Sequence, residues 1–311
     1  MRALFKELLK ASGTPVLQTL EGGVETIMSA GNIWTSAHAR RIALAERGVA
    51  PGAVLCSQAG GFQAVIDFVA STIGGFVYLP VTPARSLALR QQLAMAPIAD
   101  VAGIMFAGGQ HDGDHSPDAL PSVLAPIRVV RGAQLALYRD DAMALASVAA
   151  WTGDQLAALL AALSARLGTP MGGTRLTCSP VHHDAGFVID LLLGLCNRQT
   201  IHIRNPAHDA GVLVLREAID LEVDDLVFAP PMLDGMTQAL RHLAPEGWLR
   251  LRRTRLHTGG RALSEDRAAI AASLFGRVLV EALQPSHGEL ATRALDSVNT
   301  QVSHRKQNIS L

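Results

Sequence analysis

The chain has 311 residues, 49% of them hydrophobic, and its 27 Lys and Arg residues balance 27 Asp and Glu residues. This size predicts a packed core and more than one lobe, while zero net charge argues against nucleic acid or an acidic membrane as a partner. The three cysteines, Cys56, Cys178 and Cys196, are far apart and odd in number, which argues against a disulfide scaffold and fits a reducing cytoplasm.

The N-terminal segment MRALFKELLK is amphipathic and charged, and it lacks the continuous apolar run of a signal peptide. The longest apolar stretch, 64–81, contains Asp67 and a Gly74-Gly75 break. It therefore predicts a helix, a turn and a strand instead of a membrane span. We expect a cytoplasmic protein with no membrane segment.

Helix and strand patterns alternate along the first half of the chain. Apolar residues recur every three or four positions in the helices, and short apolar runs bounded by turn residues indicate strands. Thr152 is the expected N-cap of a long helix, with Gln155 completing a capping box. In chain order we expect helices 37–48 and 62–75, strand 76–81, helix 84–96, strands 101–107 and 127–132, and helix 151–168.

The second half repeats this rhythm. The expected strands are 175–180, 200–203, 225–231, 253–260 and 277–283, and the helices between them are 184–198, 209–219, 232–243 and 265–276. Continuous apolar strands between helices predict parallel sheets covered on both faces. We expect an α/β fold of two doubly wound lobes, over 1–147 and 148–291, with mainly parallel sheets. The polar, aperiodic tail 292–311 is expected to be disordered.

Six segments, from about Trp34 to Glu289, carry a resemblance to a known family. They read IWTSAHARRIALAERGVAPGAVL, FQAVIDFVASTIGGFVYLPVTP, LTCSPVHHDAGFVIDLLLGL, VFAPPMLDGM, RTRLHTGGRALSED and VLVEALQPSHGE. Their order resembles the adenylate-forming, or AMP-binding, superfamily: acyl- and aryl-CoA synthetases, fatty-acyl-AMP ligases and nonribosomal-peptide adenylation domains. The resemblance implies the N-terminal domain of such an enzyme, without the barrel and the C-terminal lid that follow it in the family.

The resemblance implies a reaction in which a carboxylate attacks the α-phosphorus of ATP. Backbone amides of a glycine-rich loop, a Lys and Mg²⁺ neutralise the charge that develops. The interval that should hold this loop, DDAMALASVAAWTGDQL, contains only Gly153, and no Lys lies between Met143 and Thr200. The glycine-rich stretch 168–174 lies at the carboxyl end of the long helix, where the dipole repels phosphate. We interpret that stretch as a helix stop and a turn.

The YGPTE motif of the family supplies a carboxylate for Mg²⁺, which prefers oxygen ligands. Aligned on the proline, the residues in its place are Leu283, Gln284, Pro285, Ser286 and His287. An imidazole suits zinc or copper better than magnesium, and a register that reaches Glu289 would abandon the matches at Pro285 and Ser286. We interpret the stretch as a former site and expect no cofactor, ATP and Mg²⁺ having been lost.

The parts of the family that form the carboxylic-acid pocket are kept. The P-x-x-H-x-x-G segment and the later glycine turn survive as Pro180, His183, Gly186, Gly259 and Gly260. Arg261 could pair with a carboxylate in bidentate fashion, or it could be a solvated residue of a helix turn. Because His183, Gly259, Gly260 and His287 each follow or end a parallel strand, we expect them around one cleft.

Three other constellations offer different chemistry. HDGDH, 111–115, contains two imidazoles and two carboxylates, but its glycine and its Ser/Pro-rich flank favour a solvated turn over a metal site. HHD, 182–184, could belong to a metal-dependent hydrolase, although no H-E-x-x-H-like pattern accompanies it. Cys178 and His183 could form a nucleophile and its base, but a cysteine on a buried strand is usually inert.

Three functions therefore stay open. The first is a degenerate ligase homologue that binds an acyl or aryl carboxylate, or docks on a ligase or an acyl carrier protein, as an accessory in biosynthesis. The second is an active acyl- or aryl-acid adenylating ligase that is completed by a second polypeptide. The third is the metal-dependent hydrolase. No residue is assigned as catalytic or as a metal ligand.

Overall fold

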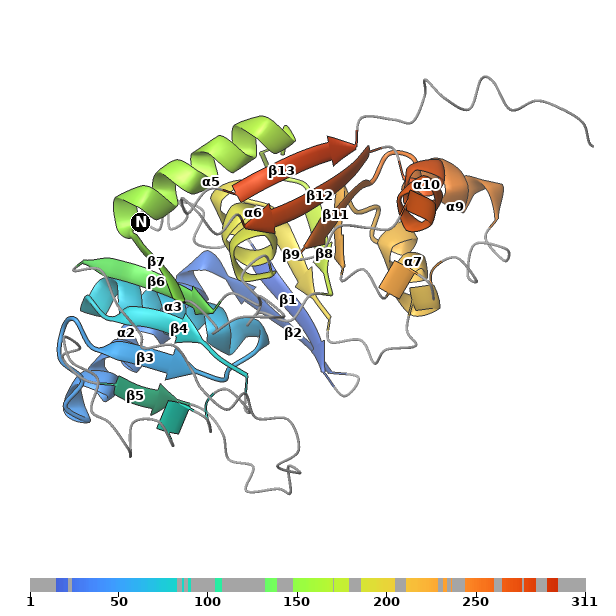
Figure 1. Ribbon diagram of the computed structural model, residues 1–311. Helices are drawn as coiled ribbons and strands as arrows, with labels where there is room; N and C mark the ends of the chain where they lie inside the picture. Colours follow the sequence, from blue (N-terminus) through green and yellow to red (C-terminus); the bar gives the residue numbers. More distant parts are fainter. Residues whose placement is uncertain are drawn as a thin grey trace, which may run out of the picture.

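The fold is described by a computed structural model (Figure 1). It describes residues 15–21, 24–82, 86, 89–90, 104–107, 132–138, 148–169, 171–178, 186–204, 211–228, 232–233, 236, 244–259, 265–275, 277–283 and 290–295. Within these ranges no helix has the length and the apolar character needed to cross a membrane.

The smaller sheet has the strand order β5-β3-β4-β6-β7. Its parallel strands are β3 (Val54–Ser57), β4 (Val77–Pro80), β5 (Ile104–Ala107) and β6 (Ala133–Tyr138), and β7 (Val148–Thr152) pairs antiparallel with β6. Helices α2 (Ala30–Glu46) and α3 (Gly61–Gly74) pack against one another beside this sheet (Figure 1).

The larger sheet has the order β13-β12-β11-β10-β8-β9-β1-β2. These strands are β1 (Pro15–Glu21), β2 (Val24–Ser29), β8 (Thr174–Thr177), β9 (Thr200–Ile203), β10 (Asp225–Phe228), β11 (Arg255–Gly259), β12 (Arg277–Leu283) and β13 (Leu290–Leu295). Only the pairs β1–β2 and β12–β13 at its two ends are antiparallel among the described pairs. The prediction of an α/β fold with two mainly parallel sheets is thus confirmed.

A shared core joins the two sheets. Its apolar residues come from α2, α3, β4, β6, β7, α5 (Gly153–Leu167), the π-helix η1 (Gly186–Leu192), α6 (Leu193–Cys196), β9 and β1. An aromatic cluster marks the junction, where the ring of Phe187 in η1 lies 5.3 Å from that of Phe68 in α3 and 5.1 Å from that of Tyr78 in β4. The buried helices between the sheets therefore hold both halves as one packed body.

A second core lies on the other face of the larger sheet. It is formed by apolar residues of β8, β10, β11 and β12 with helices α7 (Gly211–Asp220), α9 (Pro245–Leu251) and α10 (Glu265–Leu274). Helix α7 shows why these segments form helices: Val214, Leu215 and Ala218 are buried at helical spacing. This face of the sheet is covered as the continuous apolar strands predicted.

The sequence analysis did not predict β3, β6, β7, α9 or the β1–β2 hairpin, and the hairpin matters most for the topology. Its sequence signal was present, because two short runs rich in β-branched and apolar residues flank Gly22-Gly23. It joins the larger sheet through β1 and β9, whereas β7 belongs to the smaller one. Each sheet therefore takes strands from both sides of residue 147.

Two boundaries need correction. Helix α2 begins at Ala30, seven residues before the predicted start at 37, because Ser29 and Asn32 form a capping box there. Residues 292–295, which the sequence analysis assigned to the tail, lie in β13, which pairs antiparallel with β12. The free edge of β12 offers its backbone groups to this segment, and pairing satisfies them.

Candidate functional site

The candidate site is the edge of the larger sheet at which the parallel strands β8, β10, β11 and β12 end (Figure 1). The register aligns these ends: Thr177 is paired with Val227, Phe228 with Thr258, and Gly259 with Glu281. Ligands of open α/β sheets bind at this kind of edge, in the loops that follow the strands. The predicted pocket residues follow these same strands in the sequence.

The structure places only some of the predicted residues. Gly186 is the first residue of η1, Gly259 is the last residue of β11, and Leu283 is the last residue of β12. The remaining predicted residues, namely His183, Gly260, Arg261, Gln284, Pro285, Ser286 and His287, lie outside the described residues. The shared cleft thus stays a prediction, although the strands that lead into it end at one edge.

A π-helix borders this edge. Helix η1 carries Asp190, which is buried and accepts a hydrogen bond of 2.9 Å from the hydroxyl of Thr177, the last residue of β8. π-Helical turns are rare and are frequently found at functional sites. The contact fixes η1 against the end of β8.

The amino end of α5 is closed by its own side chains. Strand β7 ends at Thr152 and α5 begins at Gly153, with no residue between them. The backbone amide of Gln155 donates to the Thr152 hydroxyl at 3.3 Å, and the backbone amide of Thr152 donates to the Gln155 side chain at 2.9 Å. A side chain on Gly153 would collide with Gln134 of β6. The predicted capping box is confirmed, and these amides are used within the protein.

The stretch 168–174 behaves as the predicted helix stop. Gly168 is the left-handed C-cap of α5, and Gly172 and Gly173 also have positive φ angles. The backbone amide of Thr174 donates to the carboxylate of Asp224 at 2.8 Å, which holds the turn against β10. This use of glycine is structural.

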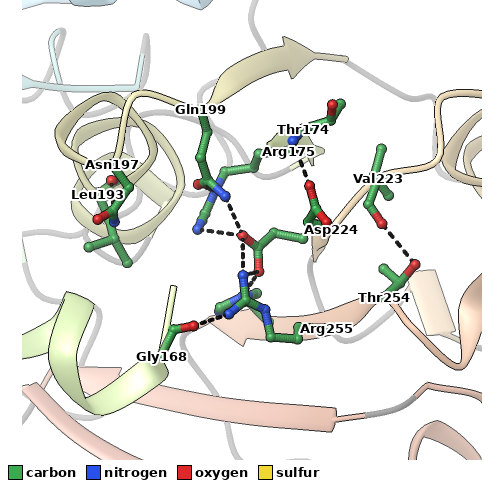
Figure 2. Close-up of polar contacts among 12 residues, drawn as sticks. Gly168, Thr174, Arg175, Leu193, Asn197, Gln199, Val223, Asp224, Thr254 and Arg255 are labelled. Atoms are coloured by element: carbon green, nitrogen blue, oxygen red, sulfur yellow. Dashed lines mark hydrogen bonds and ion pairs between the residues drawn. The ribbon is translucent and has the colours of Figure 1, made fainter. Parts of the chain in front are cut away.

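The opposite, amino-terminal edge of the larger sheet holds a buried polar network that the sequence analysis missed (Figure 2). Its centre is Asp225, the first residue of β10. The Asp225 carboxylate accepts from Gln199 at 2.6 Å, from Arg255 at 2.9 Å and from Arg175 at 3.3 Å, and His257 Nε2 lies 2.8 Å from it. Arg255 also donates to the carbonyl of Gly168, so the network ties the end of α5 to the sheet.

Electrostatics explain why this carboxylate stays ionised. Burial by itself raises the pKa of Asp225, but the charge of Arg175, the hydrogen bond and charge of His257 and the charge of Arg255 together lower it well below its usual range. An ionised carboxylate only accepts, so His257 Nε2 carries the proton. Parallel register brings these residues together from β8, β10 and β11, and spacing along the sequence gives no sign of it.

Thiol and metal chemistry gain no support from the described residues. Burial, followed by the charges of Glu217 and Asp190, raises the pKa of the Cys178 thiol, which disfavours the nucleophilic thiolate. Within the described ranges no group of three or more His, Cys, Asp or Glu residues could hold a metal ion. The segments 111–115 and 182–184 lie outside those ranges.

Comparison with known proteins agrees on the fold. No family model and no curated protein matches the sequence. Among solved structures, VinN with L-aspartate matches with a TM-score of 0.66 and 16% identity, over 93% of this chain and 77% of that one. A fatty acyl-adenylate ligase from L. pneumophila, in complex with acyl adenylate and pyrophosphate, matches with a TM-score of 0.69 and 14% identity, over 90% and 54%.

McyG A-PCP complexed with phenylalanyl-adenylate matches with a TM-score of 0.71 and 11% identity, over 93% of this chain and 59% of that one. The chain spans little more than half of the last two structures. The α/β fold is therefore that of the N-terminal portion of adenylate-forming enzymes, and the structural match confirms the resemblance found in the sequence.

Proposed function

We propose that the protein binds an acyl or aryl carboxylate at the carboxyl edge of its larger sheet and does not form acyl-adenylates by itself. It acts as an accessory protein beside a ligase or an acyl carrier protein. The observation that carries the proposal is the direct passage from β7 into α5, with the amino end of α5 closed by Thr152 and Gln155. Proteins of the same fold bind L-aspartate, an acyl adenylate or phenylalanyl-adenylate.

The phosphate-binding function requires free backbone amides and a cation. The interval 139–152 contains no glycine, and the chain has no Lys between Lys10 and Lys306. A phosphate at the amino end of α5 would compete with the capping box for the amide of Gln155. The residues at this position therefore do not fit the triphosphate of ATP.

A register of the YGPTE motif that reaches the carboxylate of Glu289 would abandon the matches at Pro285 and Ser286, and the two registers that keep the proline or the glycine of the motif have no carboxylate for Mg²⁺. Aligned on Pro285, the position of the glutamate is His287; aligned on Gly288 as the motif's glycine, it is Ala291. Ala291 lies in β13, paired with Ala282 of β12. Neither an imidazole nor a methyl group offers the oxygen ligand that Mg²⁺ prefers.

The acid pocket depends on other residues. In the family resemblance His183 and Gly186 line the carboxylic-acid site, Gly259 and Gly260 form its glycine turn, and Arg261 is the cation that can meet a carboxylate. The anchoring of η1 by Thr177 and Asp190 gives this pocket a fixed wall. Loss of ATP chemistry therefore leaves acid binding possible.

Two measurements on the intact chain test the proposal. ATP–pyrophosphate exchange is expected to stay at background with a panel of fatty, aryl and amino acids, because loss of one transition-state donor costs about 3 kcal/mol, a hundredfold or more in rate, and at least two are lost. Decanoate or benzoate is expected to raise the melting temperature, whereas Mg-ATP is not. Robust exchange by the chain alone would overturn the proposal.

ATP–pyrophosphate exchange also tests the alternative function, an active ligase that is completed by a second polypeptide. The chain spans 54–77% of the adenylate-forming structures named above, so an active ligase could be completed by a further polypeptide. Exchange that appears only when a partner ligase or lid-containing polypeptide is added would favour this alternative.

A further inference from the structure

A groove lies between α2 and α3. It has a volume of about 630 Å³ and is walled by Ser36, Ala39 and Ala43 of α2 and by Gln63 and Ile66 of α3. The α2 residues share one helical face at a spacing of three to four residues. Their side chains are so short that the two helices leave a hollow between them. Its size is that of a small-molecule site.

A buried carboxylate forms the floor of this groove, which we call the α2–α3 groove. Asp67 of α3 is 1% exposed, and it accepts hydrogen bonds from Ser57 at 2.7 Å, from Gln63 at 2.9 Å and from Arg40 Nε at 2.9 Å. Ser57 is fixed in turn, because its hydroxyl accepts from the backbone amide of Ala59 at 3.2 Å. The carboxylate is therefore held in one orientation from three sides.

The Asp67 carboxylate positions Arg40 by accepting a hydrogen bond from one of its three guanidinium nitrogens, Nε. Arg40 reaches Asp67 through Nε, and no described residue accepts a hydrogen bond from Nη1 or Nη2. Its side chain is 24% exposed and lines the groove. The guanidinium thus presents a fork of N–H donors to the groove, and this geometry matches the two oxygens of a carboxylate or of a phosphate.

We propose that the α2–α3 groove binds a small molecule through an oxyanion, a carboxylate or a phosphate, which Arg40 receives on Nη1 and Nη2. The alanine and isoleucine walls would cover an apolar body attached to that group. Asp67 acts as a positioning residue: it orients Arg40 and lowers the entropy lost on binding. None of the residues that line the groove belongs to the proposed acid pocket, so this proposal does not depend on that one.

A purely structural ion pair explains less of what is observed. Fastening α2 to α3 requires only the contact between Arg40 Nε and Asp67, which is present. It does not require a hollow beside the pair, and longer side chains in place of Ala39 and Ala43 would fill that hollow. The free donors, their fixed orientation and the adjoining volume together point to a ligand.

The test uses two probes on the full-length chain carrying Arg261→Gln, which removes the carboxylate partner of the proposed acid pocket and leaves the α2–α3 groove as the site under test. Fluorine NMR follows 4-fluorobenzoate, with the uncharged 4-fluorobenzamide as its comparison, and phosphorus NMR follows inorganic phosphate. Saturable line broadening by 4-fluorobenzoate or by phosphate, but not by the amide, is expected, and the probe that binds identifies the source of the oxyanion. Arg40→Gln is expected to lower the affinity about tenfold or more, because a charge-assisted bidentate pair is lost.

A second variant keeps the ion pair intact. Ala39→Leu fills the groove and is expected to abolish binding of 4-fluorobenzoate, whereas Ala45→Leu, on an exposed position of the same helix, is expected to leave it unchanged. The proposal is overturned if neither oxyanion binds, or if binding survives both Arg40→Gln and Ala39→Leu.

Discussion

The two edges of the larger sheet differ in how their polar groups are satisfied. At the amino-terminal edge, Asp225 gathers Arg175, Gln199, Arg255 and His257 into one buried network whose partners are all supplied by the protein (Figure 2). At the carboxyl edge, Thr177 donates to Asp190 and Arg204, directly after β9, donates to Glu217. The chain segments that follow the strands there carry His183, Arg261 and His287.

This difference distinguishes polar residues that stabilise the fold from polar residues that can bind a ligand. Charged residues that are buried and matched to one another hold strands in register, while a ligand site needs groups whose partners are left for the ligand. Arg175 and Arg255 are therefore structural even though an Arg pair beside an Asp and a His resembles catalytic machinery. The candidate site belongs at the other edge, where strand ends and a π-helix meet.

The largest expected effect comes from breaking the network at its centre. Asp225→Asn removes the negative charge that pairs with Arg175, which is fully buried, and with Arg255. Removing one partner of a buried ion pair typically costs about 3–5 kcal/mol, and urea unfolding should show a loss of this size. Asp220→Asn, an exposed change at the end of α7, is the control and should leave the unfolding free energy unchanged.

The pH dependence of the unfolding free energy tests the same role of the ionised Asp225 carboxylate. Folding lowers the pKa of Asp225, so its contribution is fully present above about pH 4, near the pKa of an unfolded aspartate, and it is lost as the pH falls below that value. The stability difference between wild type and Asp225→Asn should be constant near neutral pH and shrink in acid by up to about 1.4 kcal/mol per pH unit. Parallel unfolding curves of the two proteins at every pH would contradict the assignment.

A smaller effect is expected at the amino end of α5. Thr152→Ala removes the hydroxyl that accepts from the Gln155 amide and should cost about 1 kcal/mol of unfolding free energy, whereas Thr152→Ser should restore it. Neither variant should change the response of the melting temperature to Mg-ATP, since these amides cap the helix and bind no phosphate. A wild-type response to Mg-ATP that Thr152→Ala abolishes would turn this helix end into a nucleotide site.

The sequence predicted what depends on neighbours in the chain. The capping box at Thr152 and the stop at Gly168 are local patterns, and both are observed. The family resemblance predicted the order of the strands along the chain, and the observed parallel register places the ends of these strands at one edge of the sheet. The Asp225 network could not be predicted from the sequence. Its hydrogen-bonded side chains come from residues 24 to 50 positions apart in the chain, and only strand pairing brings them together.

The smallest effect on stability is expected at the proposed acid pocket, where Arg261→Gln gives the sharpest contrast with Asp225→Asn. The comparison is made in an Arg40→Gln background, which removes the oxyanion site proposed for the α2–α3 groove. If Arg261 is the group that meets the acid, the neutral side chain should there reduce the decanoate- or benzoate-induced rise in melting temperature to background, because a bidentate charge-assisted pair is lost. Without acid, the unfolding free energy should change by no more than about 0.5 kcal/mol, as for substitutions outside packed or paired positions. Asp225→Asn should behave in the opposite way, with lower stability and a retained response to acid.

Both effects are measured in one melting series with and without acid, and Arg261→Lys tests whether charge alone is sufficient. An Arg261→Gln protein that loses as much stability as Asp225→Asn and still responds to acid would place Arg261 with the structural residues and remove the distinction between the two edges.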